Sequence, residues 1–217
     1  MKYQFITYDN NDAIKEQILG RLTTILESYS CQSIRMPVYT CLNELLINAI
    51  KANYKNLYFE EYSPQNNALE IIPYHKALKL FKLEMSTQRI DYLLQLAREK
   101  DVKVVIDLSV DRDRNLTIRV TNPAMMTEVE RENVRKKIEM ASRYETLSEY
   151  FVMSDNDPNK EGGGLGIIFI IMVLKSFGLD PDHFIIESRN NQTLSSIRIP
   201  LNESTLLHYK NNTEREV

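Results

Sequence analysis

The sequence predicts an α/β sandwich, in which a mixed, mostly antiparallel β-sheet carries helices on one face. Two patterns in the sequence support this fold class. Apolar residues alternate in some segments, as in strands, and recur every three or four residues in others, as in helices. The segments follow one another as strand, two helices, a longer helix, two strands, two helices and two strands, an order that favours a layer of helices packed on one sheet.

The first half of the chain contains one predicted strand and three predicted helices. Residues 3–7 alternate like a short strand, and Asn11 or Asp12 then caps a helix. Residues 29–37 interrupt it, and a second helix follows over roughly residues 38–56. A third helix is expected over about residues 76–100. The apolar face of the first helix consists of Ile14, Ile18, Leu22, Ile25 and Leu26, and that of the third of Ile90, Leu93, Leu94 and Ala97.

The second half begins with two strands, at residues 102–109 and 116–120, joined by a charged turn. Thr127 and Glu130 have the spacing of a capping box that opens a helix carrying Val134, Ile138 and Ala141. Residues 154–160 have the composition of a loop, and residues 167–174 form an apolar run that is far too short to span a membrane and predicts a buried helix. Two strands follow, at residues 183–187 and 194–199, and the polar tail after Leu201 is expected to fray.

Composition favours a protein of the cytoplasm with a single domain. At 217 residues and 43% hydrophobic content, the chain can bury one sizeable core, which we expect over residues 1–201 with a polar tail at 202–217. The net charge of -3 gives no general attraction to nucleic acid or anionic lipid. Cys31 and Cys41 lack metal-binding spacing, so we expect reduced thiols. The N-terminus does not resemble a signal peptide.

Four polar residues of unlike chemistry form a stripe on the second predicted helix. Glu44, Asn48, Lys51 and Lys55 lie three or four residues apart, so they share one face, opposite an apolar face. A carboxylate can act as a base, an amide oxygen can hold magnesium, and a lysine can hold phosphate. The alternative is that the stripe is an ordinary solvated helix face.

A glycine cluster provides the second candidate motif. Four of the six glycines in the chain lie between positions 162 and 166, in the order Gly162-Gly163-Gly164-Leu165-Gly166, directly before the apolar helix. A loop without side chains that leads into a helix N-terminus is suited to a bound phosphate. Taken alone, such a cluster is more often a simple turn.

Together these motifs resemble the N box and second glycine box of the GHKL ATPase superfamily, which includes gyrase, Hsp90, histidine kinases and MutL. Residues 43–52 match the pattern Glu, three residues, Asn, Ala, one residue, Lys, and residues 162–166 match Gly-x-Gly-Leu-Gly. Residues 191–200 are similar to the closing strand of that fold. The resemblance extends from about residue 10 to residue 200, although the segment from 57 to 100 has no counterpart.

The resemblance implies the histidine-kinase-like ATPase (Bergerat) fold and a site for ATP and Mg²⁺ between helices and sheet. Asn48 would be the magnesium ligand, Glu44 would orient or deprotonate the nucleophile, and Lys51 would neutralise phosphate charge. Lys55 either assists or is solvated. The backbone of residues 162–166 would approach the phosphates, residues 154–161 would form a lid, and Thr193 would lie near the adenine.

One motif departs from the family pattern. Where the family has Asp-x-Gly-x-Gly after a strand, this chain has Asn122, Ala124 and Met126 in place of the aspartate and both glycines. The oxygen of Asn122 can accept a hydrogen bond from the adenine amino group but lacks the charge of the family's aspartate. A left-handed backbone at Ala124 or Met126 would cost roughly 1 to 2 kcal/mol. A pseudo-ATPase that serves as a protein-binding scaffold is therefore an alternative to an active enzyme.

Within the superfamily, the chain is most similar to the anti-sigma-factor serine kinases of bacterial partner switching. The resemblance therefore implies transfer of the γ-phosphate to a serine or threonine of an antagonist protein, and binding of a sigma-factor-like client. Residues 57–100 form a helical insertion that is too long for a passive loop. The helix at 76–100 either provides a dimer or partner surface or extends the core.

Overall fold

The computed structural model describes residues 1–61, 78–81, 83, 85, 90–144, 148–150 and 165–215. Its centre is a five-stranded sheet in the order β1 (Lys2–Thr7), β2 (Val104–Val110), β3 (Asn115–Asn122), β5 (Gln192–Pro200) and β4 (Phe184–Arg189). All four strand pairings are antiparallel. The expected antiparallel character is confirmed, whereas the parallel pairing of a mixed sheet is absent from the described strands.

Tight turns join two of the four antiparallel strand pairs, β2 with β3 and β4 with β5. Arg189 pairs with Gln192, so only Asn190 and Asn191 connect β4 to β5. Both asparagines have positive φ, at 51° and 59°. This is the backbone that a two-residue hairpin turn of type I′ requires, and asparagine tolerates it better than most residues. At the turn between β2 and β3, the carboxylate of Asp111 accepts hydrogen bonds from the backbone N–H groups of residues 113 and 115.

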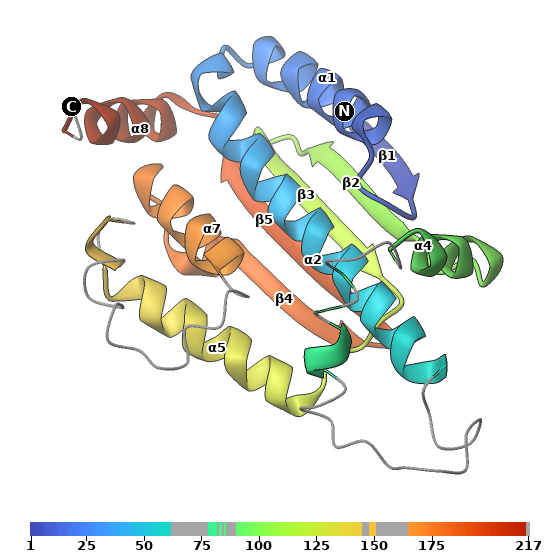
Figure 1. Ribbon diagram of the computed structural model, residues 1–217. Coiled ribbons are helices and arrows are strands. Elements are labelled where there is room, and N and C mark those ends of the chain that lie inside the picture. Colours follow the sequence, from blue (N-terminus) through green and yellow to red (C-terminus); the bar gives the residue numbers. More distant parts are fainter. Residues whose placement is uncertain are drawn as a thin grey trace.

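Six helices of the described chain accompany the sheet, and Figure 1 shows α2 and α7 lying across one face of it. Their bounds are α1 (Asp12–Ser28), α2 (Arg35–Glu61), α4 (Ile90–Glu99), α5 (Glu128–Ser142), α7 (Leu165–Ser176) and α8 (Glu203–Arg215). Short 3₁₀ turns occur at Gln32–Ile34 and Pro181–His183. Figure 1 also shows α5 beside α7 and α1 near β1. The combination of these helices with an antiparallel sheet confirms the α+β class.

The two faces of the sheet differ in burial, as a single helical layer requires. Alternate residues of β2 and β3 are buried beneath the helices, while the intervening side chains are half-buried or exposed. The intervening residues of β3 are mostly polar, including Thr117, Arg119 and Thr121. The buried side of the sheet consists of Val104, Ile106, Leu108, Val110, Leu116, Ile118, Val120, Phe184, Ile197 and Ile199.

The helix predictions were largely confirmed, with adjustments at the ends. Asn11 caps α1 by accepting from the Ile14 N–H, and all five predicted apolar residues of this helix are buried. The helix predicted at 38–56 is longer, since α2 begins at Arg35 and ends at Glu61. Pro37 does not interrupt it because the first turn of a helix needs no N–H donor. The capping box of Thr127 and Glu130 is present at the start of α5.

The insertion packs partly into the core. Met85 lies in a turn, so the helix predicted over 76–100 is not continuous, and its last part forms α4. Leu93 and Ala97 are buried and α4 packs against α2, whereas Ile90 is 38% exposed. Half of the predicted apolar stripe therefore extends the core. A dimer through this segment stays a prediction.

The expectation that the chain frays after Leu201 is wrong for residues 203–215, which form α8. Asn202 Oδ1 accepts a hydrogen bond from the Thr205 N–H at 3.0 Å, as a helix cap does. Tyr209 stacks edge-on against Phe177 with ring centroids 5.4 Å apart, and His208 lies directly over Gly178. The aromatic contacts with the end of α7 give this polar segment a surface on which to fold.

Two further expectations concern the whole chain. Cys31 and Cys41 are free, as predicted, and both are buried. Burial raises the pKa of both thiols. Among the described residues, no helix combines the length and the apolar character that crossing a membrane would require.

Candidate functional site

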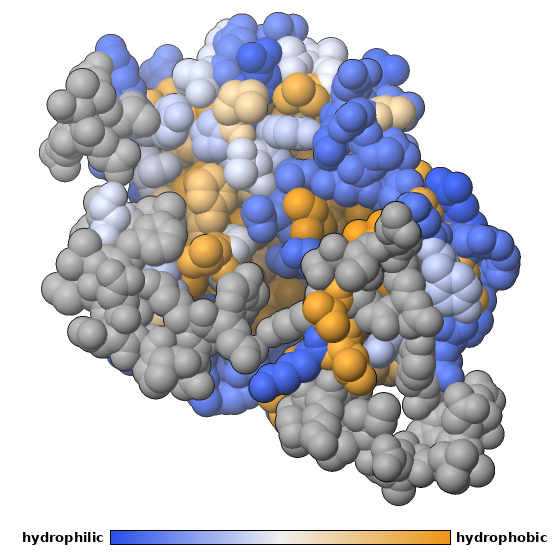
Figure 2. Space-filling view, viewed as in Figure 1, coloured by the Kyte–Doolittle hydropathy of each residue, from blue (hydrophilic) through white to orange (hydrophobic). Residues whose placement is uncertain are grey.

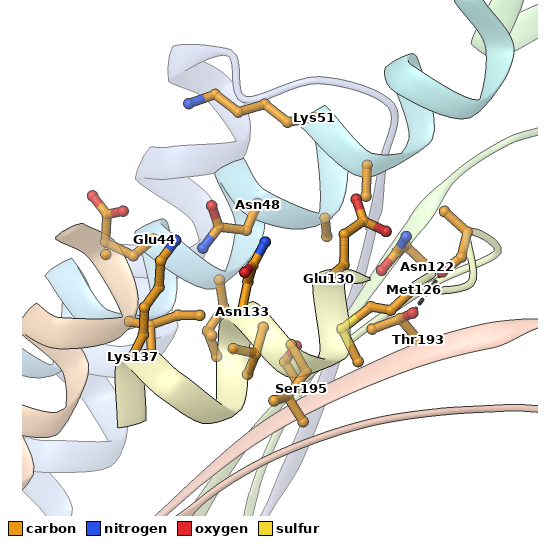
Figure 3. Close-up of a pocket in the computed structure, with 18 of the residues that line it drawn as sticks. Glu44, Asn48, Lys51, Asn122, Met126, Glu130, Asn133, Lys137, Thr193 and Ser195 are labelled. Carbon is orange, nitrogen blue, oxygen red and sulfur yellow. Dashed lines mark hydrogen bonds between the residues drawn. The ribbon is translucent and has the colours of Figure 1, made fainter. Parts of the chain in front are cut away.

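The polar stripe of α2 faces a cavity of about 410 Å³, shown in Figure 3. Its walls are α2, α5, the first residues of α7, the end of β3 and the neighbouring strands β4 and β5. Glu44, Asn48 and Lys51 line it from α2, and Asn122 and Thr193 line it from the sheet. Segments far apart in the sequence therefore place all of the predicted site residues among the described positions around one cavity.

The cavity has an apolar part next to its polar groups. Figure 2 shows hydrophobic surface in the recess at the centre of this face, with hydrophilic residues beside it. The apolar lining is contributed by Leu45, Ala49, Ala52, Ala124, Met125, Met126, Val134, Leu165, Ile167, Phe184 and Ile186. A cavity with a mostly apolar surface and a few polar groups is typical of small-molecule sites.

Glu44 lies against the first turn of α7. A Cβ atom added to Gly166 would overlap Glu44 Oε2, so the carboxylate approaches this backbone as only glycine allows. The partial positive charge of a helix N-terminus stabilises an anion there. Within the described residues, no cation lies within ion-pairing distance of Glu44. The carboxylate is half-buried and forms no ion pair with another described residue, unlike one in an ordinary salt bridge on a helix surface.

Lys55 is not solvated, which excludes one of the two alternatives for it. It is buried and forms an ion pair with Glu130 of α5. Burial, the largest influence, raises the pKa of Glu130, but hydrogen bonds from Lys55 and the Thr127 N–H outweigh it and leave that pKa lowered. Because Glu130 compensates the charge of Lys55, Lys51 is the cation of the α2 stripe that carries no ion pair within the described residues.

At the other end of the cavity, three groups form a buried hydrogen-bond chain. Asn53 Nδ2 donates to the Lys103 carbonyl at 3.4 Å, and Asn122 Nδ2 donates to Asn53 Oδ1 at 3.0 Å. Asn53 and Asn122 are 2% and 3% exposed. These hydrogen bonds connect α2 to the residue before β2 and to the end of β3. Asn122 Oδ1 has no hydrogen bond within the described residues.

Hydrogen bonds also hold the segment in which alanine and methionine replace the family's glycines. Thr193 Oγ1 donates to the Ala124 carbonyl at 2.6 Å and lies 2.6 Å from Ser188 Oγ, which accepts from the Met126 N–H at 3.0 Å. Neither Ala124 nor Met126 has a positive φ. The predicted penalty for a left-handed backbone therefore does not arise.

Sequence reasoning missed the contribution of α5 to the site. Asn133 and Lys137 line the cavity, and Figure 3 shows both side chains on α5 facing the α2 stripe. Together with Glu130 they lie three and four residues apart, so they share one helix face. The same three- and four-residue spacing that identifies the α2 stripe also identifies this one, whereas a capping box marks only the start of a helix. Ser195 of β5, which also lines the cavity, has no distinguishing pattern.

The glycine motif is only partly visible in the structure. Leu165 and Gly166 line the cavity at the start of α7. Gly162, Gly163 and Gly164, and the lid predicted at 154–161, lie outside the described residues. The described part of the motif lies beside Glu44 at the edge of the cavity.

The donor set around Asn48 fits magnesium bound to phosphate. Within the described residues there is no group of three His, Cys, Asp or Glu side chains that could hold an ion alone. Magnesium retains water and binds to proteins through one or two oxygen ligands together with phosphates of the substrate. The exposed amide of Asn48 would supply one such oxygen.

Comparison with known proteins gives no functional assignment. No model of a protein family matches the chain, and no solved structure matches it. The chain is similar to an uncharacterized protein of Treponema pallidum (strain Nichols), with 31% identity over 184 residues. The match covers 82% of this chain and 34% of that protein, so the chain spans about a third of the length of this relative.

Proposed function

We propose that the chain binds ATP with Mg²⁺ in the cavity between α2, α5 and the sheet. The observation that carries the proposal is that α2, the end of β3, β5 and the start of α7 each contribute a motif residue to one cavity. Its volume of about 410 Å³ lies in the range of small-molecule sites, roughly 300 to 1,000 Å³. If the polar stripe were only a solvated helix face, we would not expect it to share a cavity with residues of the other motifs.

The two ends of the cavity suit the two ends of a nucleotide. Figure 3 shows Glu44 and Asn48 on one side of the cavity, where phosphates and the metal would bind the Asn48 amide oxygen. Lys51 also lines the cavity and would supply positive charge, although its ammonium points away from the other labelled groups in this view. Asn122 and Thr193 lie at the other end beside the apolar lining, which suits the base. At the end that contains Asn48, magnesium would neutralise charge on the phosphates.

For the activity, we propose a protein serine/threonine kinase or an anti-sigma-type regulator in partner switching. Glu44 would accept the proton of a serine or threonine hydroxyl on a partner protein. The hydroxyl oxygen would then attack the γ-phosphorus, and the bond to the β-phosphate oxygen would break to release ADP. The position of Glu44 supports this role, because its side chain lines the cavity one helical turn from Asn48, the proposed magnesium ligand.

Thermal unfolding with and without ATP and Mg²⁺ tests the binding proposal. A ligand that binds only the folded state raises its stability, by about 2.7 kcal/mol at a concentration 100 times Kd. We expect a higher Tm for the wild-type protein and a smaller increase for Lys51→Ala. Lys136→Ala, on the outer face of α5, is the matched control and should respond like the wild type. An unchanged Tm at millimolar ATP would contradict the proposal.

The part of the cavity proposed to hold the adenine has no charged group, which favours a second candidate. This candidate is a scaffold that binds proteins and hydrolyses or transfers little or no phosphate from ATP. Asn122 carries no charge, and the side chain of Met126 lines the cavity in place of a glycine. Incubation with labelled ATP and cell extract separates the candidates. A kinase labels a partner and Glu44→Gln does not, whereas a scaffold gives the same background with both proteins.

A further inference from the structure

We propose that Asn53 is a positioning residue that fixes the amide of Asn122 with its oxygen towards the cavity, so that the site selects a base with an exocyclic amino group. This inference rests on the proposed nucleotide binding and adds the feature that sets base specificity. It also identifies a residue outside the polar stripe, since Asn53 does not line the cavity.

The orientation follows from the first member of the hydrogen-bond chain. The Lys103 carbonyl can only accept, so the group of Asn53 that faces it must be the NH₂ group. Asn53 then presents Oδ1 to Asn122, which must present its own NH₂ group in return. The orientation of each amide group therefore determines the orientation of the next. The oxygen of Asn122 is left to face the cavity, where it can only accept a hydrogen bond.

Burial makes this order difficult to reverse. Turning the Asn122 amide over would place its Oδ1 against Asn53 Oδ1, which lies 3.0 Å from the Asn122 nitrogen, and leave two acceptors facing each other. Turning Asn53 as well would set its oxygen against the Lys103 carbonyl. Both side chains are at least 97% buried, so water cannot easily satisfy the groups left unpaired. These hydrogen bonds accordingly hold the Asn122 amide in one orientation without the help of a charged residue.

The chemical consequence concerns position 6 of a purine. Adenine carries an amino group there, which can donate to Asn122 Oδ1, whereas hypoxanthine and guanine carry a carbonyl oxygen. A site built around a fixed acceptor rejects a ligand that offers a second acceptor, because both groups lose water without gaining a partner. ATP and ITP are suitable probes because they share the triphosphate and differ in this group.

The test measures the ratio of ITP to ATP dissociation constants by calorimetry in the presence of Mg²⁺. The wild type should bind ATP at least about tenfold more tightly than ITP. Asn53→Leu removes both contacts and lets Asn122 turn, so this ratio should fall to within about twofold. Asn53→Asp still accepts from Asn122 and should keep the preference, although its second oxygen faces the Lys103 carbonyl and should lower the Tm. Asn56→Leu, on the same helix but away from the cavity, is the matched control and should match the wild type.

The outcomes separate this inference from the proposed function. Equal binding of ATP and ITP by the wild type would overturn the inference and leave nucleotide binding intact. A wild-type ratio in Asn53→Leu would mean that Asn53 is only structural. Binding of neither nucleotide by the wild type would end both proposals.

A second variant tests the orientation even if Asn53→Leu does not fold. Asn122→Asp installs the carboxylate of the family pattern, but it has no N–H group to give to Asn53 Oδ1. We expect a lower Tm than the wild type at pH 8, because two buried acceptors then face each other. An unchanged Tm together with tighter ATP binding would show that Asn53 does not determine the orientation.

Discussion

The polar groups on the two walls of the cavity differ in burial and in hydrogen bonding. On α2, Asn48 and Lys51 are exposed and have no hydrogen-bond or ion-pair partner within the described residues. On the sheet, Asn122 and Thr193 are buried, and their hydrogen bonds connect them to Asn53, Ala124 and Ser188. Apart from Lys55, which is buried and paired with Glu130, the α2 wall therefore offers Asn48 and Lys51 to solvent, while the sheet wall holds its groups in fixed positions.

This difference corresponds to two kinds of ligand chemistry. Phosphates and magnesium bring their own strong charges and waters, so the groups that meet them can be mobile and solvated. A base is recognised by a few neutral hydrogen bonds, which discriminate only if donors and acceptors cannot rearrange. Variants of the α2 wall should therefore change chemistry and affinity, and variants of the buried groups should change stability or selectivity.

The largest effect is expected from Glu44→Gln, on the α2 wall. If Glu44 is the base, its amide replacement cannot take up a proton, and phosphate transfer to a partner should fall by roughly 10² to 10⁴-fold. Quantification of labelled partner protein over time measures this loss. Because the substitution keeps the shape of the side chain, ATP should still raise the Tm of the variant.

Glu60→Gln provides the control for this prediction. Glu60 is an exposed residue near the end of the same helix and pairs with Lys100. Exposed ion pairs contribute little, so this variant should transfer phosphate at the wild-type rate. Equal transfer by Glu44→Gln and Glu60→Gln would remove Glu44 from the catalytic role.

The next effect concerns the metal. Asn48→Ala removes the one proposed protein ligand. Loss of a group that only orients a metal ligand already weakens a site by about 10- to 100-fold, so loss of the ligand should cost at least that much. We expect a loss of that size in ATP affinity with Mg²⁺ present and little difference between variant and wild type in EDTA. Calorimetric titrations in both buffers measure it. The same loss in EDTA would mean that Asn48 acts without the metal.

The contrast between the walls also explains what could be predicted from the sequence. The α2 stripe depends on local helical periodicity, so spacing alone placed Glu44, Asn48 and Lys51 on one face. The partners of the sheet wall are distant in sequence, since Asn53 meets Asn122 and Thr193 meets Ala124. No local pattern reports such pairs. The same holds for Lys55, whose partner Glu130 is 75 residues away.

The ends of elements were hidden for a different reason. The extension of α2 to Glu61 depends on Leu57 and Tyr58, which are buried in the core, and no cap marks that end in the sequence. Helix α8 has little apolar character of its own and is held by contacts with α7. Tertiary packing decides both cases, and it outweighs local preference.

A third prediction concerns the ion pair that joins the walls. Lys55→Met should destabilise the protein by about 2 kcal/mol, since Glu130 loses its cation while its side chain is only 28% exposed. Full burial would cost more, but water screens part of the remaining charge. Chemical denaturation at pH 7 measures the change. Arg143→Met, which breaks an exposed pair between the residue that follows α5 and Glu139 of that helix, should cost less than about 0.5 kcal/mol.

The last prediction concerns Glu130→Gln, which keeps an acceptor for Lys55 and for the Thr127 N–H but leaves the charge of the buried Lys55 without an anion. The folded-state pKa of Glu130 lies below its ordinary value of 4.5, so the ionised form is bound more favourably in the folded protein. This stabilisation is present above about pH 4.5 and is lost as the pH falls through the lowered pKa. The wild type should therefore be the more stable protein at pH 7, and the difference should shrink as the solution is acidified. Denaturation series of both proteins from pH 7 to more acidic buffers measure that difference, and one that stayed constant would show that Glu130 gains nothing from its charge.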